Sequence, residues 1–407
     1  MNTTPEAIKA DPVVFDKLIS PVQPWLVEWD QQPLSQAAKK LGFALFVRLL
    51  LFRLFAQIHS LRDLVLDLKT SPTAQALALP AVGLSTIHDA FVRYPVGWFT
   101  ALATCLATRL VLQPLPELEA LGPLWCVDSS YWPLIRQIGW LDRQGLAGVR
   151  LHMGLALNTL CPALFLLTLD KAPTQSERRA LLAMVAAGVT YILDRGYVHI
   201  GLYHQLWDRG AYFVVRERNN LQYHVRAVID VVLPPGYGFL RSVRDTVARL
   251  RRDPNGPLYR LVHFVVAGHE FYLLTNRFDL TTFQIIQLYG WRWQVELLFR
   301  AWKHTLHGLH LINLSEAGME IQFNVLLIAA LLWVAFQQAA VAAAAAQAPA
   351  PAAPVPATAA VTQTPTARLG AVFRVAWRWV RQRMRLLCNC LVQPFSHYVR
   401  HLAELRL

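Results

Sequence analysis

GVRLHMGLALNTLCPALFLLTL, residues 148–169, is the stretch that decides the fold class. Its two apolar runs are separated by Asn158 and Thr159, and Pro162 follows at the start of the second run. These residue types are typical of turns, and the Val, Leu and Phe around them favour strands. Each run is also far shorter than the roughly 18 residues of a membrane-spanning helix. The stretch therefore predicts two buried strands joined by a tight loop.

Further elements lie on both sides of this hairpin. LWCVDSSYW (124–132) opens with a short apolar run that stops at Asp128 and predicts a strand before the hairpin. SERRALLAMVAAG (176–188) predicts a helix after it, and VTYILDRGY (189–197) and AYFVVRER (211–218) predict two more strands. Three antiparallel strands, followed by a helix that leads to an added strand, make a mixed sheet with helices packed on it. The expected fold class is therefore α/β.

The rest of the chain differs from this core in its residue pattern. Residues 30–117 have helical periodicity, with start signals at Ser60 and Ser85, and suit either a small DNA-binding bundle or a helical cap. A second β-rich patch follows the core and is expected to be interrupted by the basic stretch 241–252. The expected organisation is a helical region (1–117), a core in two parts (118–217 and 280–338), a β-rich insertion (218–279), an extended Ala/Pro-rich linker (339–367) and a basic amphipathic helix (368–407).

The charge balance restricts the class of partner. The 407 residues include 39 Lys and Arg against 26 Asp and Glu, a net charge of +13, although only 16% of residues are charged. Such an excess indicates a polyanion or an anionic membrane surface as partner. The five cysteines are odd in number and form no C-x2-C pair, which excludes a disulfide framework and a zinc knuckle. We therefore expect a reducing cytoplasm, with no export signal in the first thirty residues.

Two segments keep a membrane association open as an alternative. VLLIAALLWVAF (325–336) has 12 uninterrupted apolar residues, fewer than a span needs, although the alanines beyond it could lengthen the segment. In the C-terminal region, Arg374, Arg378, Arg381 and Arg385 form one basic stripe at helical spacing. Such a stripe can contact phosphates or anionic lipid, or be only the solvated face of a docking helix.

The strongest chemical signal lies in a predicted helix that opens with a Thr cap near residue 281. Tyr289, Arg292, Glu296 and Lys303 would share an arc of about 60° on a continuous helix. A carboxylate that holds a cation, beside a guanidinium and an ammonium that bind phosphate oxygens, suits a phosphodiester backbone near a metal ion. The alternative is an i,i+4 Arg–Glu ion pair on a solvated helix face.

Two aspartates extend this pattern. Asp128 and Asp194 each follow a short apolar run, at the expected end of a strand. Each alone is compatible with an ordinary loop or capping aspartate. With Glu296 they supply three carboxylates, and oxygen ligands of this kind suit two divalent cations that clamp the oxygens of a phosphoryl displacement.

The sequence resembles the bacterial insertion-sequence transposases of the DDE type, in the cut-and-paste group that bears a Y-R-E-K signature. All four signature residues are present at the spacing of that group. The blocks WCVDSSYW (125–132), VTYILDRGY (189–197) and 271–303 resemble the family's corresponding segments, and the resemblance covers roughly residues 120–335. Arg150 departs from it, because relatives often carry Lys there, and the linker and the basic tail have no counterpart.

The resemblance implies an RNase H-like core with a β-rich insertion, and an N-terminal helical region that reads transposon ends. The catalytic and metal-binding residues that it implies are Asp128, Asp194 and Glu296. The DNA-phosphate-binding residues that it implies are Tyr289, Arg292 and Lys303.

The expected activity is cleavage of transposon ends and joining of the exposed 3′-hydroxyls to target DNA. It would use two Mg²⁺ ions, with Mn²⁺ as a substitute. The expected partners are double-stranded DNA and a second copy of the chain in a synaptic dimer, in the cytoplasm at the nucleoid, with no stable membrane partner. A catalytically inactive relative that only binds DNA ends is the first alternative.

Overall fold

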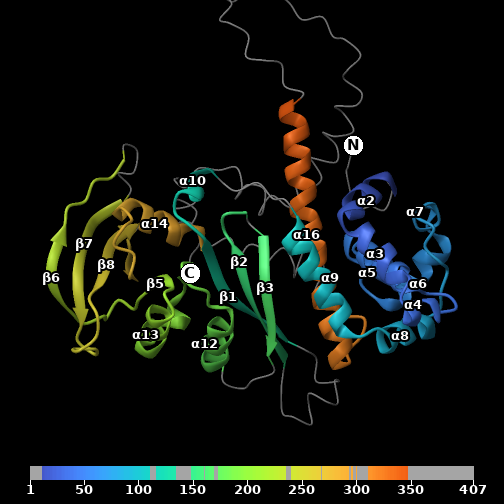
Figure 1. Cartoon of the computed structure of the whole chain (residues 1–407), viewed down its shortest axis with the longest axis horizontal. Helices are drawn as coiled ribbons and strands as arrows, with labels where there is room; N and C mark the ends of the chain where they lie inside the picture. The colour runs from blue at the N-terminus through green and yellow to red at the C-terminus, as the bar shows by residue number, and fades with distance from the viewer. Residues whose placement is uncertain are drawn as a thin grey trace, which may run out of the picture. The chain divides into compact units, whose positions relative to one another are not determined.

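The structure is a computed structural model that describes residues 12–110, 116–133, 148–159, 161–168, 173–234, 240–266, 268–292, 295–296, 299 and 310–346 (Figure 1). The described residues belong to two units. Residues 12–110 and 310–346 form a helical unit, and residues 116–299 form a unit built on a sheet. The expected basic helix over 368–407 lies outside the described residues.

The helical unit consists of short helices and one long one. The helices are α2 (Pro12–Ile19), the 3₁₀ turn η1 (Ser20–Val22), α3 (Gln23–Asp30), α4 (Pro33–Gln36), α5 (Phe43–Phe55), α6 (Leu61–Thr70), α7 (Pro72–Ala76), α8 (Leu84–Arg93), α9 (Val96–Arg109) and α16 (Glu316–Ala346). The start signal at Ser60 is confirmed, because its hydroxyl accepts a hydrogen bond from the backbone N–H of Asp63 at 3.0 Å. The signal near Ser85 is one residue late, since α8 begins at Leu84.

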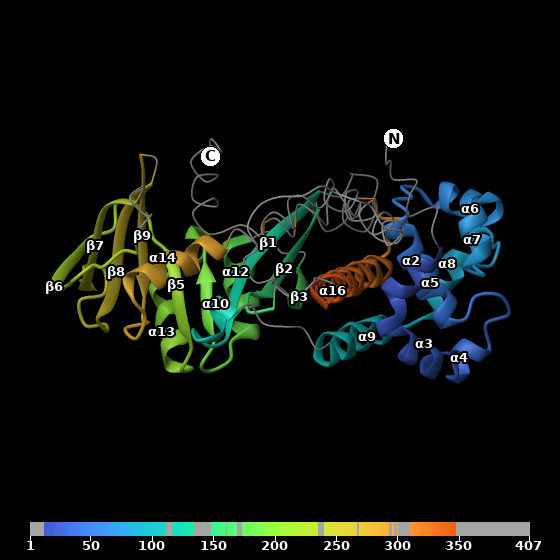
Figure 2. The same cartoon turned by 90° about the horizontal axis from the view of Figure 1, so that it is seen from above.

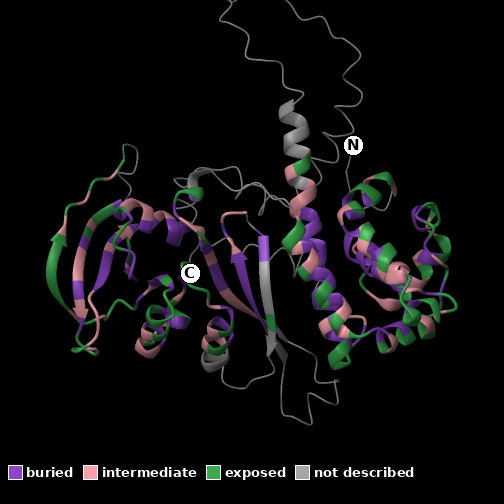
Figure 3. Cartoon of the chain, viewed as in Figure 1, coloured by how far each residue is buried: buried purple, intermediate pink, exposed green. Residues whose placement is uncertain are grey.

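Helix α16 contains the long apolar segment. Glu316–Phe336 is long and apolar enough to cross a membrane, by length and composition alone, and is the one such segment within the described ranges. Of its most apolar stretch, 72% is buried, and α16 packs against α2, α5, α8 and α9 (Figures 2 and 3). This burial is typical of a core helix in a helical bundle. The helix also continues through 339–346, where an extended linker was expected, because alanine is the best helix former.

The other unit is built on one mixed sheet of nine described strands. Its order is β3-β2-β1-β4-β5-β9-β8-β7-β6. The strands are β1 (Leu124–Pro133), β2 (Gly148–Ala156), β3 (Cys161–Thr168), β4 (Thr190–Leu193), β5 (Tyr212–Arg216), β6 (Tyr223–Ile229), β7 (Leu240–Leu250), β8 (Tyr259–Val266) and β9 (His269–Thr275). β1, β2 and β3 are antiparallel, and β4 and β5 run parallel to β1. The predicted hairpin and the predicted mixed sheet are both confirmed.

The β-rich insertion is a continuation of this same sheet, since β9 pairs with β5. The prediction that the basic stretch 241–252 interrupts the insertion is wrong, because most of it lies in β7, which pairs with both β6 and β8. The one acid of this stretch, Asp245, is buried in the sheet. Its carboxylate accepts a bifurcated hydrogen bond from Arg260 Nε, 3.0 Å to each oxygen, another from Arg260 Nη2 at 2.6 Å, and one from Thr282. Because Arg260 lies in β8, a cross-strand ion pair compensates this buried acid.

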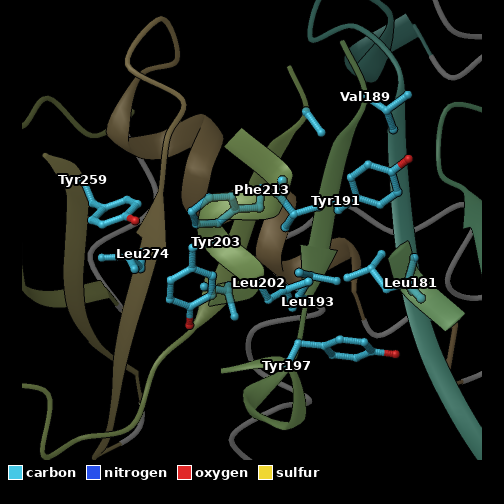
Figure 4. Packing of buried hydrophobic residues seen from close by; sticks show 14 of the residues in the cluster. Leu181, Val189, Tyr191, Leu193, Tyr197, Leu202, Tyr203, Phe213, Tyr259 and Leu274 are labelled. Atoms are coloured by element: carbon cyan, nitrogen blue, oxygen red, sulfur yellow. The ribbon is translucent and has the colours of Figure 1, made fainter. Parts of the chain in front are cut away.

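Helices cover both faces of the sheet. They are α10 (Pro116–Glu119), α12 (Pro173–Met184), the 3₁₀ turn η2 (Arg195–Tyr197), α13 (Ile200–Asp208) and α14 (Thr282–Trp291). Side chains alternate between the two faces of a strand. On one face, Val127, Tyr191 and Phe213 join Leu181 of α12 and Leu202 of α13 in a buried core (Figure 4). The opposite face of the same strands packs against α14, which contacts β4, β5, β8 and β9.

Candidate active site

Asp128 and Asp194 lie on neighbouring parallel strands. β1 and β4 pair in parallel with Cys126 opposite Ile192, so two further residues bring Asp128 level with Asp194 on the α14 face. Asp194 directly follows the end of β4, as predicted. Asp128 does not end its strand, because β1 continues to Pro133 through its pairing with β2. The polar residues after Asp128 suggested a loop, but their backbone is held in the ladder.

Helix α14 brings the signature residues to this edge of the sheet. Its predicted Thr cap is confirmed, since Thr281 and Gln284 form a reciprocal capping box. The helix ends at Trp291, so the prediction that the signature residues share one uninterrupted helix is wrong. The backbone N–H of Arg292 bonds to Tyr289 O at 3.1 Å, an i to i−3 bond that tightens the last turn. The Cys126 thiol donates to Arg292 O at 3.3 Å and fixes this break against β1.

The guanidinium of Arg292 lies between two of the predicted catalytic acids. Its Nη1 is 3.7 Å from Asp128 Oδ2, and its Nη2 donates a hydrogen bond to Glu296 Oε1. Its Cζ lies 5.7 Å from the centre of the Tyr289 ring. The i,i+4 Arg–Glu ion pair of the alternative interpretation is present, but Arg292 is only 8% exposed, so this residue does not lie on a solvated helix face. The break in α14 therefore does not separate Tyr289, Arg292 and Glu296.

The surroundings of Asp128 disfavour the charged form of its carboxyl group. Burial raises the pKa of this carboxyl to about 7, and the negative charges of Glu296 and Asp194 act in the same direction. Arg292 and the backbone N–H of Ser129, 2.7 Å from Asp128 Oδ1, partly oppose that rise. All three acids therefore lie within electrostatic reach of one another. The effect of burial on this carboxyl outweighs the opposing charge of Arg292.

Arg216 is a second cation at this edge, and the sequence analysis missed it. It is the last residue of β5, and the pairing of Leu193 with Val215 places it one strand away from Asp194. Its Cζ lies 4.2 Å from the Phe271 ring, and its Nε is buried without a hydrogen-bond partner among the described residues. Arg216 also lies close enough to Tyr289 to affect the pKa of that buried phenol, which burial raises. The signal in the sequence that could have identified Arg216 is its position near the end of a predicted strand.

The donor set at this edge fits a hard divalent cation in its chemistry. Asp128, Asp194 and Glu296 offer carboxylate oxygens, the ligands that Mg²⁺ and Mn²⁺ prefer. As they stand, the residues that the structure describes contain no group of three His, Cys, Asp or Glu side chains placed to share one ion. The guanidinium of Arg292 lies where the acids would converge. Lys303, the fourth signature residue, lies outside the described residues.

Comparisons with known proteins show the family of this chain. Residues 120–332 match the family model described as "Transposase DDE domain", which spans both aspartates and Glu296. A Sinorhizobium fredii protein named as the transposase y4zB is 30% identical over 259 residues, which cover 62% of this chain and 71% of that protein. A Geobacillus stearothermophilus protein named as a transposase for insertion sequence element IS5377 is 24% identical over 271 residues, covering 62% and 67%.

This chain belongs to the family of bacterial insertion-sequence transposases with a DDE domain. It is therefore a DNA transposase, and of the two kinds of partner that its basic charge left open, a polyanion or an anionic membrane surface, the family supports a polyanion, DNA. Among solved structures, a piggyBac transposase synaptic complex with hairpin DNA aligns at a TM-score of 0.41 and 11% identity, over 97% of this chain and 85% of that one. A likeness that remote carries no argument about this chain.

Proposed function

We propose that this transposase cleaves the ends of its insertion sequence and joins the exposed 3′-hydroxyls to target DNA at the site formed by β1, β4 and the residues after α14. We further propose that β1 to β5 form an RNase H-like core. The observation that carries the proposal is the contact of one guanidinium, that of Arg292, with both Asp128 and Glu296. Asp128 and Glu296, which are 168 positions apart in the sequence, thus contact the same cation, and Asp128 lies level with the third acid, Asp194.

Asp128, Asp194 and Glu296 would hold two Mg²⁺ ions, for which Mn²⁺ can substitute. When bound, the ions would supply charge stabilisation at the attacking and leaving oxygens of the phosphodiester. The raised pKa of Asp128 supports this role, because a carboxylate whose charged form is disfavoured by burial is stabilised by a bound cation. Shared ligation would require the three acids to draw closer together than they are here, as Arg292 leaves them.

Arg292 has a second task in this proposal. Its guanidinium would turn from the two acids to the DNA backbone, where a planar fork can bind two phosphate oxygens. Tyr289 and Lys303 would complete the phosphate contacts. Tyr289 is only 6% exposed, so its phenol reaches a phosphate only if DNA enters this edge closely. Arg292 thus neutralises the acids in the free protein and grips the substrate in the complex.

The partners follow from the same reaction. We propose that double-stranded terminal repeats are bound partly by the helical unit, and that two chains form a dimer when two ends are brought together. The working compartment would be the cytoplasm, at the nucleoid. The burial of α16 inside the helical unit supports a core role for its apolar surface rather than a membrane partner.

The experiment is cleavage and strand transfer on labelled duplexes that carry the ends of the element. The wild type is expected to nick the ends and join them in Mg²⁺. Asp128→Ala, Asp194→Ala and Glu296→Ala should each bind the ends and lose both reactions by at least about 10³-fold. Binding without any nick by the wild type, in Mg²⁺ or Mn²⁺, would instead identify an inactive end-binding relative.

A further inference from the structure

A fourth carboxylate, that of Glu177 in α12, lies on the α12 face of the sheet, close to the segments that carry Asp128 and Asp194. Its Oε1 accepts a hydrogen bond from Ser129 Oγ and another from Arg150 Nη1, the latter at 3.0 Å. Arg150 Nη1 also donates to Ser129 Oγ at 3.1 Å, which closes a three-membered network. The Glu177 side chain is 14% exposed and that of Arg150 is 23% exposed. The network is therefore largely shielded from solvent, where charge-assisted hydrogen bonds are strong.

The same carboxylate also touches the segment that carries Asp194. A Cβ atom added at Gly196 would lie only 3.2 Å from Glu177 Oε2, closer than ordinary van der Waals contact. Gly196 is the second residue after Asp194, in the turn η2, and Ser129 directly follows Asp128. One side chain thus binds the hydroxyl of the residue after Asp128 and lies against the backbone of the second residue after Asp194.

The network acts from the opposite face of the sheet. Ser129 lies on the same face of β1 as Val127, which packs against α12 in the core. Asp128 lies on the opposite face, the one that packs against α14. Tyr197, in the same core, is buried, and its hydroxyl has no hydrogen-bond partner within the described ranges. Burial and then the charges of Asp128 and Glu177, together with Asp194, raise the pKa of this phenol. All three acids therefore lie within electrostatic range of one ring.

From this geometry we propose that Glu177 is a positioning residue that sets the spacing between Asp128 and Asp194, and so the affinity of their site for divalent cations. Glu177 itself binds neither cation nor DNA. Ser129 and Arg150 hold its Oε1, and the absent side chain at Gly196 leaves room for its Oε2. The proposal rests on the proposed function, because it assumes that the two aspartates share metal ions. Residues that orient metal ligands commonly change metal affinity 10–100-fold when substituted.

The first test measures Mn²⁺ affinity of the full-length protein by electron paramagnetic resonance, with an end duplex bound. We expect the dissociation constant to rise about 10-fold in Glu177→Gln and more in Glu177→Ala, with end-DNA affinity in metal-free buffer unchanged. Asp253→Asn is the matched control. Its carboxylate is also hydrogen-bonded, to His204 Nε2 at 2.7 Å, and only 12% exposed, but among the described residues it has no hydrogen bond to either aspartate-bearing segment. Mn²⁺ affinity in this control should match the wild type.

The second test is a double-mutant cycle between Gly196 and Glu177. Gly196→Ala should weaken Mn²⁺ binding several-fold in the wild-type background, because the new methyl group displaces Glu177 Oε2. In the Glu177→Ala background the same substitution should have no further effect. A merely structural role would lower the unfolding temperature without this coupling.

The outcomes separate the two proposals. If Mn²⁺ binds the wild type and is lost in Asp128→Ala, but Glu177→Gln binds it as the wild type does, the positioning role is refuted and the proposed function stands. If Gly196→Ala costs the same with and without the Glu177 carboxylate, the positioning role is also refuted. If the wild type itself binds no Mn²⁺ on DNA, the proposed function fails first.

Discussion

Replacing Asp128 by Asn should stabilise the metal-free protein at pH 8. Burial raises the pKa of Asp128 to about 7, from 3.8 in an unfolded chain. The native state therefore holds the proton over a range where the unfolded state has lost it, so this residue lowers stability as pH rises from about 4 to 7. Above pH 7 the loss is constant. The side-chain amide of the Asp128→Asn variant would keep the shape of the carboxylate without its charge.

The size of the effect follows from the pKa difference. About three units at roughly 1.4 kcal/mol each give an upper bound of about 4 kcal/mol. The carboxylate is 22% exposed and the site can relax, so about 1–2 kcal/mol is the realistic gain. For a unit of this size, that corresponds to an unfolding midpoint higher by about 2–8 °C.

The assay is thermal unfolding of full-length wild type and Asp128→Asn in chelator, at pH 5 and pH 8. The gain should be larger at pH 8 than at pH 5. Asp279→Asn is the opposite control, because its hydrogen bonds from Arg277 lower the pKa of Asp279. That carboxylate contributes stability that is lost as pH falls, so its Asn variant should be destabilised at pH 8. An Asp128→Asn protein no more stable than the wild type at pH 8 would refute the reasoning.

Three further predictions concern the cations of the sheet-based unit. Arg292→Ala should bind Mn²⁺ more tightly than the wild type in calorimetry without DNA, yet lose end cleavage. Unchanged or weaker Mn²⁺ binding would show that the Arg292 guanidinium does not occupy the place of the metal. Arg216→Ala should weaken end-DNA binding and reduce the slope of log affinity against log salt by about 1, while an unchanged slope would remove Arg216 from the DNA contact. Asp245→Asn should leave the Arg260 guanidinium buried without its counter-charge and lower the free energy of unfolding, measured by chemical denaturation, by about 3–5 kcal/mol. A loss below about 1 kcal/mol would mean that this pair does not anchor β7 to α14.

Local sequence pattern predicted those elements whose burial leaves a simple signature. The hairpin of β2 and β3, the fully buried β4 and the capping box at Thr281 all follow from apolar runs and turn or cap residues within a few positions. The pattern failed where long-range pairing overrides composition. β7 is rich in arginine, and only its pairing with β6 and β8 and the Asp245–Arg260 bond makes it a strand.

The candidate site shows the same division. Residue type and spacing, with a family resemblance, were enough to select Asp128, Asp194 and Glu296. They could not show that α14 ends at Trp291, where a thiol from the distant strand β1 bonds to Arg292 O. Nor could they show Glu177 or Arg216, whose significance lies in contacts with other strands and helices. Such contacts depend on tertiary packing, which a single sequence does not display.

Metal-specific rescue tests the central claim most directly. Asp128→Cys, Asp194→Cys and Glu296→Cys should each abolish end cleavage in Mg²⁺, since a thiolate is a poor ligand for that hard ion, and regain measurable cleavage in Mn²⁺. The corresponding Ala variants should stay inactive in both. Rescue of the Cys but not the Ala variants would establish that the three side chains ligate the catalytic cations. Cys variants that remain as inactive as Ala in Mn²⁺, beside an active wild type, would contradict it.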